Sequence, residues 1–305
     1  MYQFDDSYIQ LQTSKKMFQD ICDSFFYDLA PENEYKNRQH IQLVIKEVNV
    51  YSEGGVSKSK RDLKEQVYTV SSSRSIMTWE SLLNKITIKM YTKDVSDYRM
   101  CRNIIYFFMT EALSQIRIRN GRFPFHSSGI SFENKGFLLM GQPGAGKTTT
   151  TLRLLPYGYN LMSDDRPFLD RNGYMYSFLR PINISADTFN IIRGLYPQLK
   201  KISNLPDVSK IAVSASSLCS VHNCHRCKID KILILNQCGK KFERMDSAQA
   251  CKLLLMINYP YYSGADINRL MEMCYNISTS LSVYQTEVRY NQEWIQILDH
   301  FLKQE

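Results

Sequence analysis

The chain has 305 residues, of which 44% are hydrophobic and 22% are charged, and its formal net charge is +8. This composition is typical of a globular protein and excludes wholesale disorder. No apolar run approaches the ~18 residues of a membrane-spanning helix, so we expect no membrane partner. The N-terminus is acidic and lacks the apolar segment of a secretory signal, so we expect a cytoplasmic protein.

The surplus of positive charge is spread along the whole chain. It suits anionic ligands such as nucleotides. No basic stripe is interleaved with aromatic residues in the pattern that nucleic-acid binders show. We therefore expect no nucleic-acid partner.

Residues 1–95 predict a β-rich region. Strands are predicted at 41–50, 66–70 and 85–91. The spacing of apolar residues from Val95 to about Arg117 predicts a helix with a broad apolar face, and we assign residues 96–120 to a connecting helix. Docking of a peptide substrate by strand addition is one hypothesis for the β-rich region.

Residues 121–305 predict an α/β domain, because short strands alternate with helices from Phe125 onward. The predicted strands lie at 135–140, 159–163 and 281–288, and the predicted helices at 149–155, 248–257, 266–276 and 292–302. Asp246 and Gln249 resemble a capping box at the start of the second of these helices.

A full G-x-x-x-x-G-K-T motif lies between the predicted strand 135–140 and the helix that follows it. Its glycines let backbone N–H groups converge on phosphate oxygens where a Cβ would clash. Lys147 supplies a positive charge for the β- and γ-phosphates, and the Thr148 hydroxyl is placed to ligate Mg²⁺. The residues expected to bind the nucleotide are Gly141, Gly144, Ala145, Gly146, Lys147, Thr148 and Thr149.

Two adjacent carboxylates, Asp164 and Asp165, follow the predicted strand 159–163. Ligand groups gather at the carboxyl ends of strands, so both face the glycine-rich loop if this strand lies beside 135–140. One carboxylate can then hold a metal ion, and the other can take a proton from an attacking hydroxyl. His126 precedes the strand that leads to the loop, and its spacing alone leaves a structural and a catalytic role open.

Together, the runs at 125–130, 136–148 and 154–166 resemble the catalytic domain of HPr kinase/phosphorylase and the related kinases of lasso-peptide precursors. His126 lies 15 residues before Gly141 and Asp164 lies 17 residues after Lys147, in the register of that family. The resemblance implies a mixed α/β P-loop kinase domain of the HPr kinase/phosphoenolpyruvate carboxykinase type, here with an N-terminal β-rich region.

The resemblance also implies roles for individual residues. Asp164 would be the general base toward a serine hydroxyl, Asp165 and Thr148 would hold Mg²⁺, and His126 would lie beside the transferring phosphate. ATP and Mg²⁺ would be the cofactors, and a homo-oligomer is expected because kinases of this family often form one. One departure is Ile191, which stands where HPr kinases carry a metal-binding Glu in a Glu-x-Arg-Gly signature.

From these residues we expect an ATP-dependent kinase that transfers the γ-phosphate to a Ser or Thr hydroxyl. The expected partner is a peptide or small protein, such as a ribosomally made precursor peptide. Two alternatives stay open. One is a kinase for a free small metabolite, and the other is a nucleotide-gated peptide-binding module without turnover, which the missing Glu keeps open.

A cluster of cysteines and histidines lies at 219–227. Its members are Cys219, His222, Cys224, His225 and Cys227. The C-x₂-C spacing within it fits a zinc knuckle, and the cluster could complete a structural Zn²⁺ site. No second pair of ligands with standard spacing follows downstream. Reduced thiols in a polar loop and a redox-sensitive loop are the alternatives.

Overall fold

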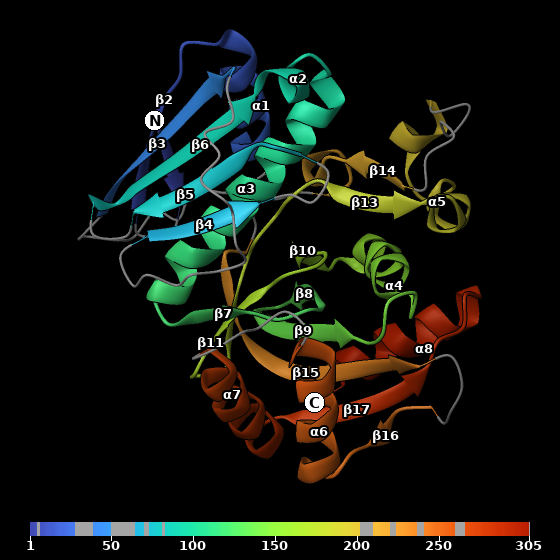
Figure 1. The fold of residues 1–305 in the computed structure, drawn as a ribbon. Helices are drawn as coiled ribbons and strands as arrows, with labels where there is room; N and C mark the ends of the chain where they lie inside the picture. Colours follow the sequence, from blue (N-terminus) through green and yellow to red (C-terminus); the bar gives the residue numbers. More distant parts are fainter. Residues whose placement is uncertain are drawn as a thin grey trace. The chain divides into compact units, whose positions relative to one another are not determined.

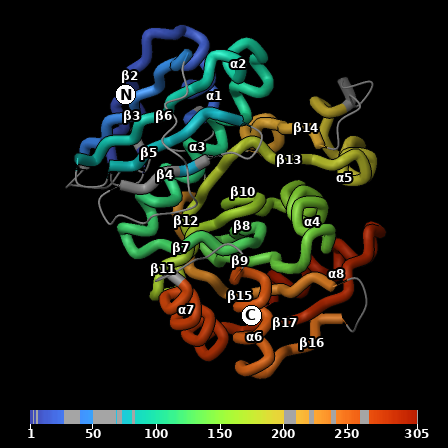
Figure 2. Tube along the Cα trace, viewed as in Figure 1, coloured from blue at the N-terminus to red at the C-terminus, as the bar shows by residue number. Residues whose placement is uncertain are grey.

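The computed structural model describes residues 1–4, 7–27, 39–49, 65–69, 73–80, 83–201, 210–219, 224–236, 241–259 and 266–304. The chain divides into two compact units, Met1–Asn120 and Gly121–Glu305. In Figure 2 the first unit runs from blue to teal and the second from green to red. Both units combine helices with a mixed sheet, so the fold is mixed α/β, as the sequence predicts.

The first unit is built on a six-stranded sheet with the order β1-β2-β3-β6-β5-β4. The pairs β2–β3 and β3–β6 are parallel, and the other neighbours are antiparallel. The strands are β1 (Tyr2–Phe4), β2 (Ser7–Gln12), β3 (Gln39–Val48), β4 (Glu65–Thr69), β5 (Ile76–Glu80) and β6 (Lys85–Tyr91). The three strands predicted in this region are confirmed as β3, β4 and β6.

The described residues of the first unit form three α-helices: α1 (Lys16–Tyr27), α2 (Thr92–Val95) and α3 (Tyr98–Arg119). The helix predicted from Val95 is confirmed as α3. It begins at Tyr98 because the Asp97 side chain caps it, accepting hydrogen bonds from the backbone N–H groups of Arg99 and Met100 at 2.8 and 3.1 Å. Helix α1 was not predicted, although most of its apolar residues, Phe18, Ile21, Cys22, Phe25 and Phe26, are buried.

The second unit contains a nine-stranded sheet with the path β10-β8-β9-β15-β12-β11-β7. Strand β17 pairs with β15, and β16 pairs with β17. Its strands are β7 (Arg122–Pro124), β8 (Ser128–Phe132), β9 (Lys135–Met140), β10 (Asn160–Ser163), β11 (Phe168–Asp170), β12 (Tyr174–Tyr176), β15 (Arg226–Asn236), β16 (Glu243–Arg244) and β17 (Ser282–Glu287). A separate two-stranded sheet joins β13 (Ile182–Ser185) to β14 (Lys210–Val213).

Strands β9, β15 and β17 form a parallel core at the centre of this sheet (Figure 1). Leu138, Leu139 and Met140 are all fully buried, so both faces of β9 are covered. A parallel strand buried on both faces requires a continuous apolar run, which explains the sequence of β9. Because the three strands are parallel, their carboxyl ends meet at one edge.

Direct adjacency of β10 and β9, the condition under which the sequence places the carboxylates beside the loop, is not met. Strand β8 lies between them and is antiparallel to both. Strands β9 and β10 therefore run in the same direction, and their carboxyl ends reach the same edge of the sheet. The carboxylates that follow β10 therefore reach the same edge of the sheet as the glycine-rich loop that follows β9, although the strand order differs from the one considered.

In the part of the second unit that the structure describes there are five α-helices: α4 (Lys147–Leu154), α5 (Ala186–Ile192), α6 (Ser247–Asn258), α7 (Asp266–Ser280) and α8 (Gln292–Lys303). It also contains 3-10 turns at Leu155–Tyr157, Pro197–Lys201 and Ala215–Ser217. Helices α4, α5 and α8 pack on one face of the sheet, where Phe137 and Leu233 enter a common core. Helices α6 and α7 lie on the other side (Figure 1). The predicted cap of α6 is confirmed, because Asp246 accepts from the Gln249 N–H at 2.9 Å.

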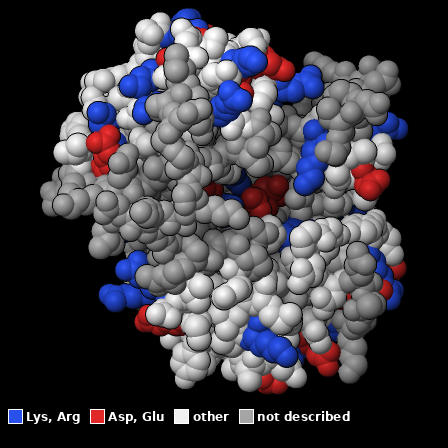
Figure 3. Space-filling model, in the orientation of Figure 1, with Lys and Arg blue, Asp and Glu red and all other residues white. Residues whose placement is uncertain are grey.

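None of the described helices is long and apolar enough to cross a membrane. On the face drawn in Figure 3, Lys and Arg side chains are scattered among Asp and Glu side chains.

Candidate active site

The glycine-rich loop connects the end of β9 to the start of α4. Gly141 has a φ of 151°. A Cβ there would lie 2.7 Å from the Leu235 carbonyl oxygen and 2.8 Å from the Ala145 Cβ. The loop can therefore leave β9 this close to β15 only because residue 141 has no side chain.

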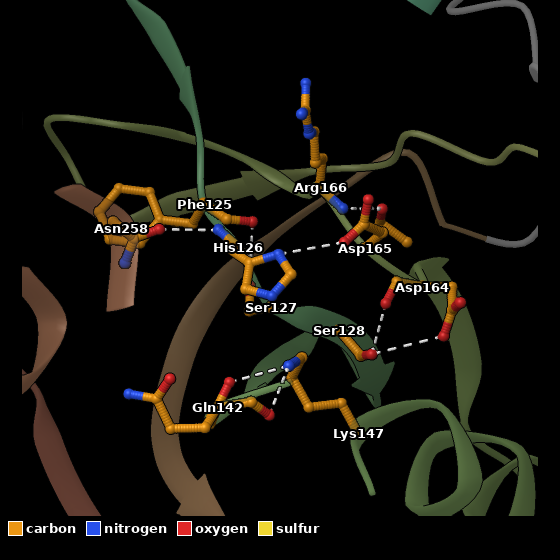
Figure 4. A network of polar contacts seen from close by, with 12 residues as sticks. Phe125, His126, Ser127, Ser128, Gln142, Lys147, Asp164, Asp165, Arg166 and Asn258 are labelled. Carbon is orange, nitrogen blue, oxygen red and sulfur yellow. Dashed lines mark hydrogen bonds and ion pairs between the residues drawn. The ribbon is translucent and has the colours of Figure 1, made fainter. Parts of the chain in front are cut away.

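Gly146 is the N-cap residue of α4 and makes no side-chain cap, which leaves the first N–H groups of the helix available to an anion. The Lys147 ammonium donates hydrogen bonds to the carbonyl oxygens of Gly141 and Gln142 at 2.8 and 3.3 Å (Figure 4). Burial lowers the pKa of Lys147, while the charges of Asp165 and Asp164 act in the opposite direction. The ammonium thus lies over the loop, with two carboxylates near enough to affect its pKa.

Asp164 follows β10 directly and lies next to α4. Its backbone carbonyl oxygen accepts a hydrogen bond from the Ser128 hydroxyl at 2.5 Å, and its carboxylate lies 3.5 Å from the same hydroxyl (Figure 4). The Thr148 side chain also hydrogen-bonds to the Asp164 carboxylate. Burial raises the pKa of Asp164 to about 6, although the hydrogen bond from Thr148 opposes this change.

Asp165 lies between two cationic or potentially cationic groups. Its carboxylate oxygens lie 3.1 Å from His126 Nδ1 and 3.0 Å from Arg180 Nη2. Burial acts to raise the pKa of Asp165, but the hydrogen bond from His126 and the charge of Arg180 outweigh it. The pKa of Asp165 is therefore held well below its usual range, and the two neighbouring carboxylates have strongly different pKa values.

His126 is fixed by its backbone as well as by Asp165. The buried Asn258 side chain accepts a hydrogen bond from the His126 N–H at 2.7 Å and donates one to the Leu254 carbonyl at 2.8 Å. On either side of His126, the N–H groups of Phe125 and Ser127 donate to Pro167 and Asp165 carbonyl oxygens. The segment that carries His126 is thus paired with the turn that carries the carboxylates.

The structure brings together the loop, Lys147, Thr148, the two carboxylates and His126, all within the second unit. The two carboxylates have different neighbours. The Thr148 side chain hydrogen-bonds to Asp164, whereas Asp165 contacts His126 and Arg180. The reason is that Asp164, immediately after β10, lies on the side of α4, while Asp165 turns toward the β7–β8 connection.

Sequence reasoning missed two polar residues of this site, Arg180 and Asn258. Arg180 follows β12 in an irregular segment and belongs to no motif, so nothing in its surroundings distinguishes it from a surface arginine. Asn258 did have a signal. It stands four residues after Leu254 on the buried side of α6, where a polar residue requires a partner.

The structure does not support the zinc hypothesis. Within the part of the chain that it describes, no group of three Cys, His, Asp or Glu side chains could hold a metal ion. Cys219 hydrogen-bonds to the Ala215 carbonyl, whereas Cys224 and Cys227 hydrogen-bond to each other. Strand β15 begins at Arg226, inside the cysteine and histidine cluster, and Cys227 is buried in this strand. His222 lies outside the described residues.

No protein-family model and no curated protein matches the chain. The structure is similar to that of the HPr(Ser) kinase/phosphatase from Coxiella burnetii, with a TM-score of 0.34 and 9% sequence identity, and the match covers 59% of this chain and 88% of that chain. At this TM-score and identity, the match says nothing about the reaction of this chain.

Proposed function

We propose that this protein is an ATP-dependent kinase that transfers the γ-phosphate to a Ser or Thr hydroxyl of a peptide or small protein. The observation that carries the proposal is the pair of carboxylates beside the glycine-rich loop. Asp164 has a pKa near 6, while Asp165 is held ionised by His126 and Arg180. Two titratable groups whose pKa values are pushed apart are typical of a site that assigns proton transfer to one of them.

The glycine-rich loop would bind the phosphates of ATP. The uncapped N–H groups at the start of α4 and the positive end of its dipole favour an anion there. Lys147 now donates to two loop carbonyl oxygens, which are weaker acceptors than a phosphate. On nucleotide binding, the ammonium would exchange these acceptors for phosphate oxygens.

The residues around the loop also fit Mg²⁺, which prefers hard oxygen ligands. Thr148 provides a hydroxyl, and Asp165 provides a carboxylate that stays ionised at neutral pH because its pKa is lowered. When bound, Mg²⁺ supplies positive charge against the phosphate oxygens. Of the two carboxylates, Asp164 has the higher pKa and is therefore the better base.

Asp164 would accept the proton of the acceptor hydroxyl. With a pKa of about 6, the carboxylate is about nine-tenths ionised at pH 7 and still basic enough to take a proton in the transition state. Ser128 and Thr148 hydrogen-bond to Asp164 and hold it in place. His126 and Arg180 would act as positioning residues, because both contact Asp165.

The choice of a peptide or protein acceptor follows from the resemblance of the motifs to HPr kinase and to the lasso-peptide precursor kinases. A free metabolite kinase uses the same phosphate chemistry, and a binding module would use the loop without turnover. These two alternatives are therefore outcomes of the test.

The test is incubation of the full chain with γ-labelled ATP and Mg²⁺ in the presence of peptides and small proteins from the same cell. The expected result is a labelled peptide or protein whose mass rises by about 80 Da, the mass of one phosphoryl group. Lys147→Ala serves as the control. Label on small hydroxyl compounds alone would replace the protein acceptor by a metabolite, and ATP binding without consumption would contradict the kinase.

A further inference from the structure

Tyr290 stands at the same sheet edge as the glycine-rich loop. The loop follows β9, and Tyr290 follows β17, in the connection to α8. Because β9, β15 and β17 are parallel neighbours, both segments leave the sheet at its carboxyl edge. The carboxylates follow β10, which lies on the opposite side of β9. The loop is thus flanked by acids on one side and by a tyrosine on the other.

The Tyr290 ring contacts the loop at Gly146, whose φ is 88°. A Cβ at that position would lie 2.6 Å from the Tyr290 hydroxyl oxygen and 3.2 Å from Cε1 of the ring. Tyr290 nevertheless keeps 49% of its surface exposed. The absence of a side chain at residue 146 therefore lets an aromatic ring approach the loop while one part of the ring stays open to a ligand.

The segment that carries Tyr290 is held against α4. Val288 donates its N–H to the Asn236 carbonyl at the end of β15, at 2.9 Å. Arg153, on α4, donates to the Asn291 carbonyl at 3.1 Å, and the Asn291 side chain caps α8 by accepting from the Trp294 N–H at 2.9 Å. The helix that begins at the glycine-rich loop thus also fixes the position of the tyrosine.

We propose that Tyr290 stacks on the base of the nucleotide. This proposal rests on the proposed function. If Asp164 activates the acceptor, the γ-phosphate must point toward β10, and the nucleoside must then extend the other way, over the ends of β15 and β17. Tyr290 stands in that direction and presents an exposed ring. Aromatic side chains stack on any base through its π-face, so the residue selects for a nucleoside and not for one particular base.

The experiment compares two ligands by calorimetric titration of the full chain in the presence of Mg²⁺. ATP has both phosphates and a base, whereas inorganic tripolyphosphate has the phosphates alone. Tyr290→Ala is expected to weaken ATP binding about tenfold, which is within the range for loss of one stacked aromatic, and to leave tripolyphosphate binding within about twofold. Tyr290→Phe keeps the ring and should bind both ligands as the unchanged chain does.

Tyr275→Ala is the matched control. Tyr275 is 62% exposed, but it lies near the end of α7, which leads into the opposite end of β17. Equal weakening of both ligands by Tyr290→Ala would assign the ring to support of the loop and overturn the stacking proposal, as would unchanged ATP binding. An unchanged chain that binds neither ligand would contradict the proposed function itself, so the two failures are distinguishable.

Discussion

Both units of the protein have parallel strands that end in charged residues, but those residues differ in what they contact. In the first unit, Glu47 near the end of β3 forms an ion pair with Lys15, which lowers its pKa. Asp94, just after β6, is buried and accepts hydrogen bonds from the hydroxyls of Ser73 and Ser75 at 2.6 Å each. Lys15 thus stabilises the ionised form of Glu47, and the Asp94 carboxylate is held by two serine hydroxyls.

In the second unit, the equivalent edge of the sheet holds a glycine-rich loop and a carboxylate whose pKa is raised. Asp164 has hydroxyl neighbours, yet burial dominates and favours its protonated form. The contrast shows that the carboxyl end of a parallel strand determines where a side chain lies but not its chemistry. What that side chain can do depends on its solvation and its charged neighbours.

The largest effect that tests this contrast is expected for Asp164→Asn, compared with Glu47→Gln as the matched control in the first unit. Loss of the base should lower kcat about 10³-fold, measured as phosphoryl transfer at saturating ATP and acceptor, with nucleotide affinity unchanged. Glu47→Gln should leave kcat unchanged. Ordinary transfer by Asp164→Asn would remove Asp164 as the base, and an equal loss in both variants would abolish the contrast.

A second comparison uses the lysines at the two sheet edges. Lys147→Ala should lower kcat/KM for ATP about 10²-fold, because the variant loses a partly desolvated positive charge beside the phosphates. Lys15→Ala removes a charge that is paired with Glu47 and should have no effect on kcat/KM. The measurement is the initial rate of ATP consumption over a range of ATP concentrations. Equal rates for Lys147→Ala and the unchanged chain would remove Lys147 as a phosphate-binding residue.

The sequence was most informative where one local pattern determines the structure. The apolar run of β9, the glycine-rich loop and the start of α4 are adjacent in the chain, so local periodicity and turn chemistry define them. The helices α6, α7 and α8 likewise follow from apolar spacing, and α6 also from its capping residue Asp246. The carboxylates could be placed at the correct edge because strand direction alone decides which edge a following residue reaches.

What could not be predicted depends on contacts between distant parts of the chain. No pattern in β10 shows that β8 will separate it from β9, since strand order is a property of the whole sheet. Arg180 reaches Asp165 only through the path of an irregular segment. The short strands β11, β12, β13 and β14 carry too few residues for a periodicity to emerge.

The effect of Arg180 on Asp164 can be tested through the pH dependence of activity. Activity of the unchanged chain should rise with pH through about 6, because Asp164 must lose its proton to act as a base. The charge of Arg180 lowers the pKa of Asp164, so Arg180→Gln should move this limb of the profile to higher pH. If the pKa of Asp164 rises by about one unit, the variant should keep about a fifth of the activity that the unchanged chain has at pH 6.

The control for this pH shift is Arg171→Gln, which removes the same charge from the exposed turn between β11 and β12. Its pH profile should coincide with that of the unchanged chain. If Arg180→Gln lowers kcat equally at every pH, Arg180 supports the structure without tuning the carboxylates.

The smallest expected effect concerns stability. Here substitution of Asp164 and substitution of Asp94 should change Tm in opposite directions. Because the pKa of Asp164 is raised in the folded state, its contribution to stability is present at low pH and is lost as the pH rises through about 6. Asp164→Asn removes the charged form and should therefore raise Tm by about 3 °C at pH 8. At pH 5 the rise should be smaller, because the folded state is then mostly protonated at this residue while the unfolded state is already mostly ionised. Asp94→Asn replaces a buried acid held by two serine hydroxyls and should lower Tm at pH 8. Thermal unfolding of both variants at the two pH values provides the measurement. A lower Tm for Asp164→Asn at pH 8 would mean that the ionised carboxylate stabilises the fold, and the second unit would then resemble the first.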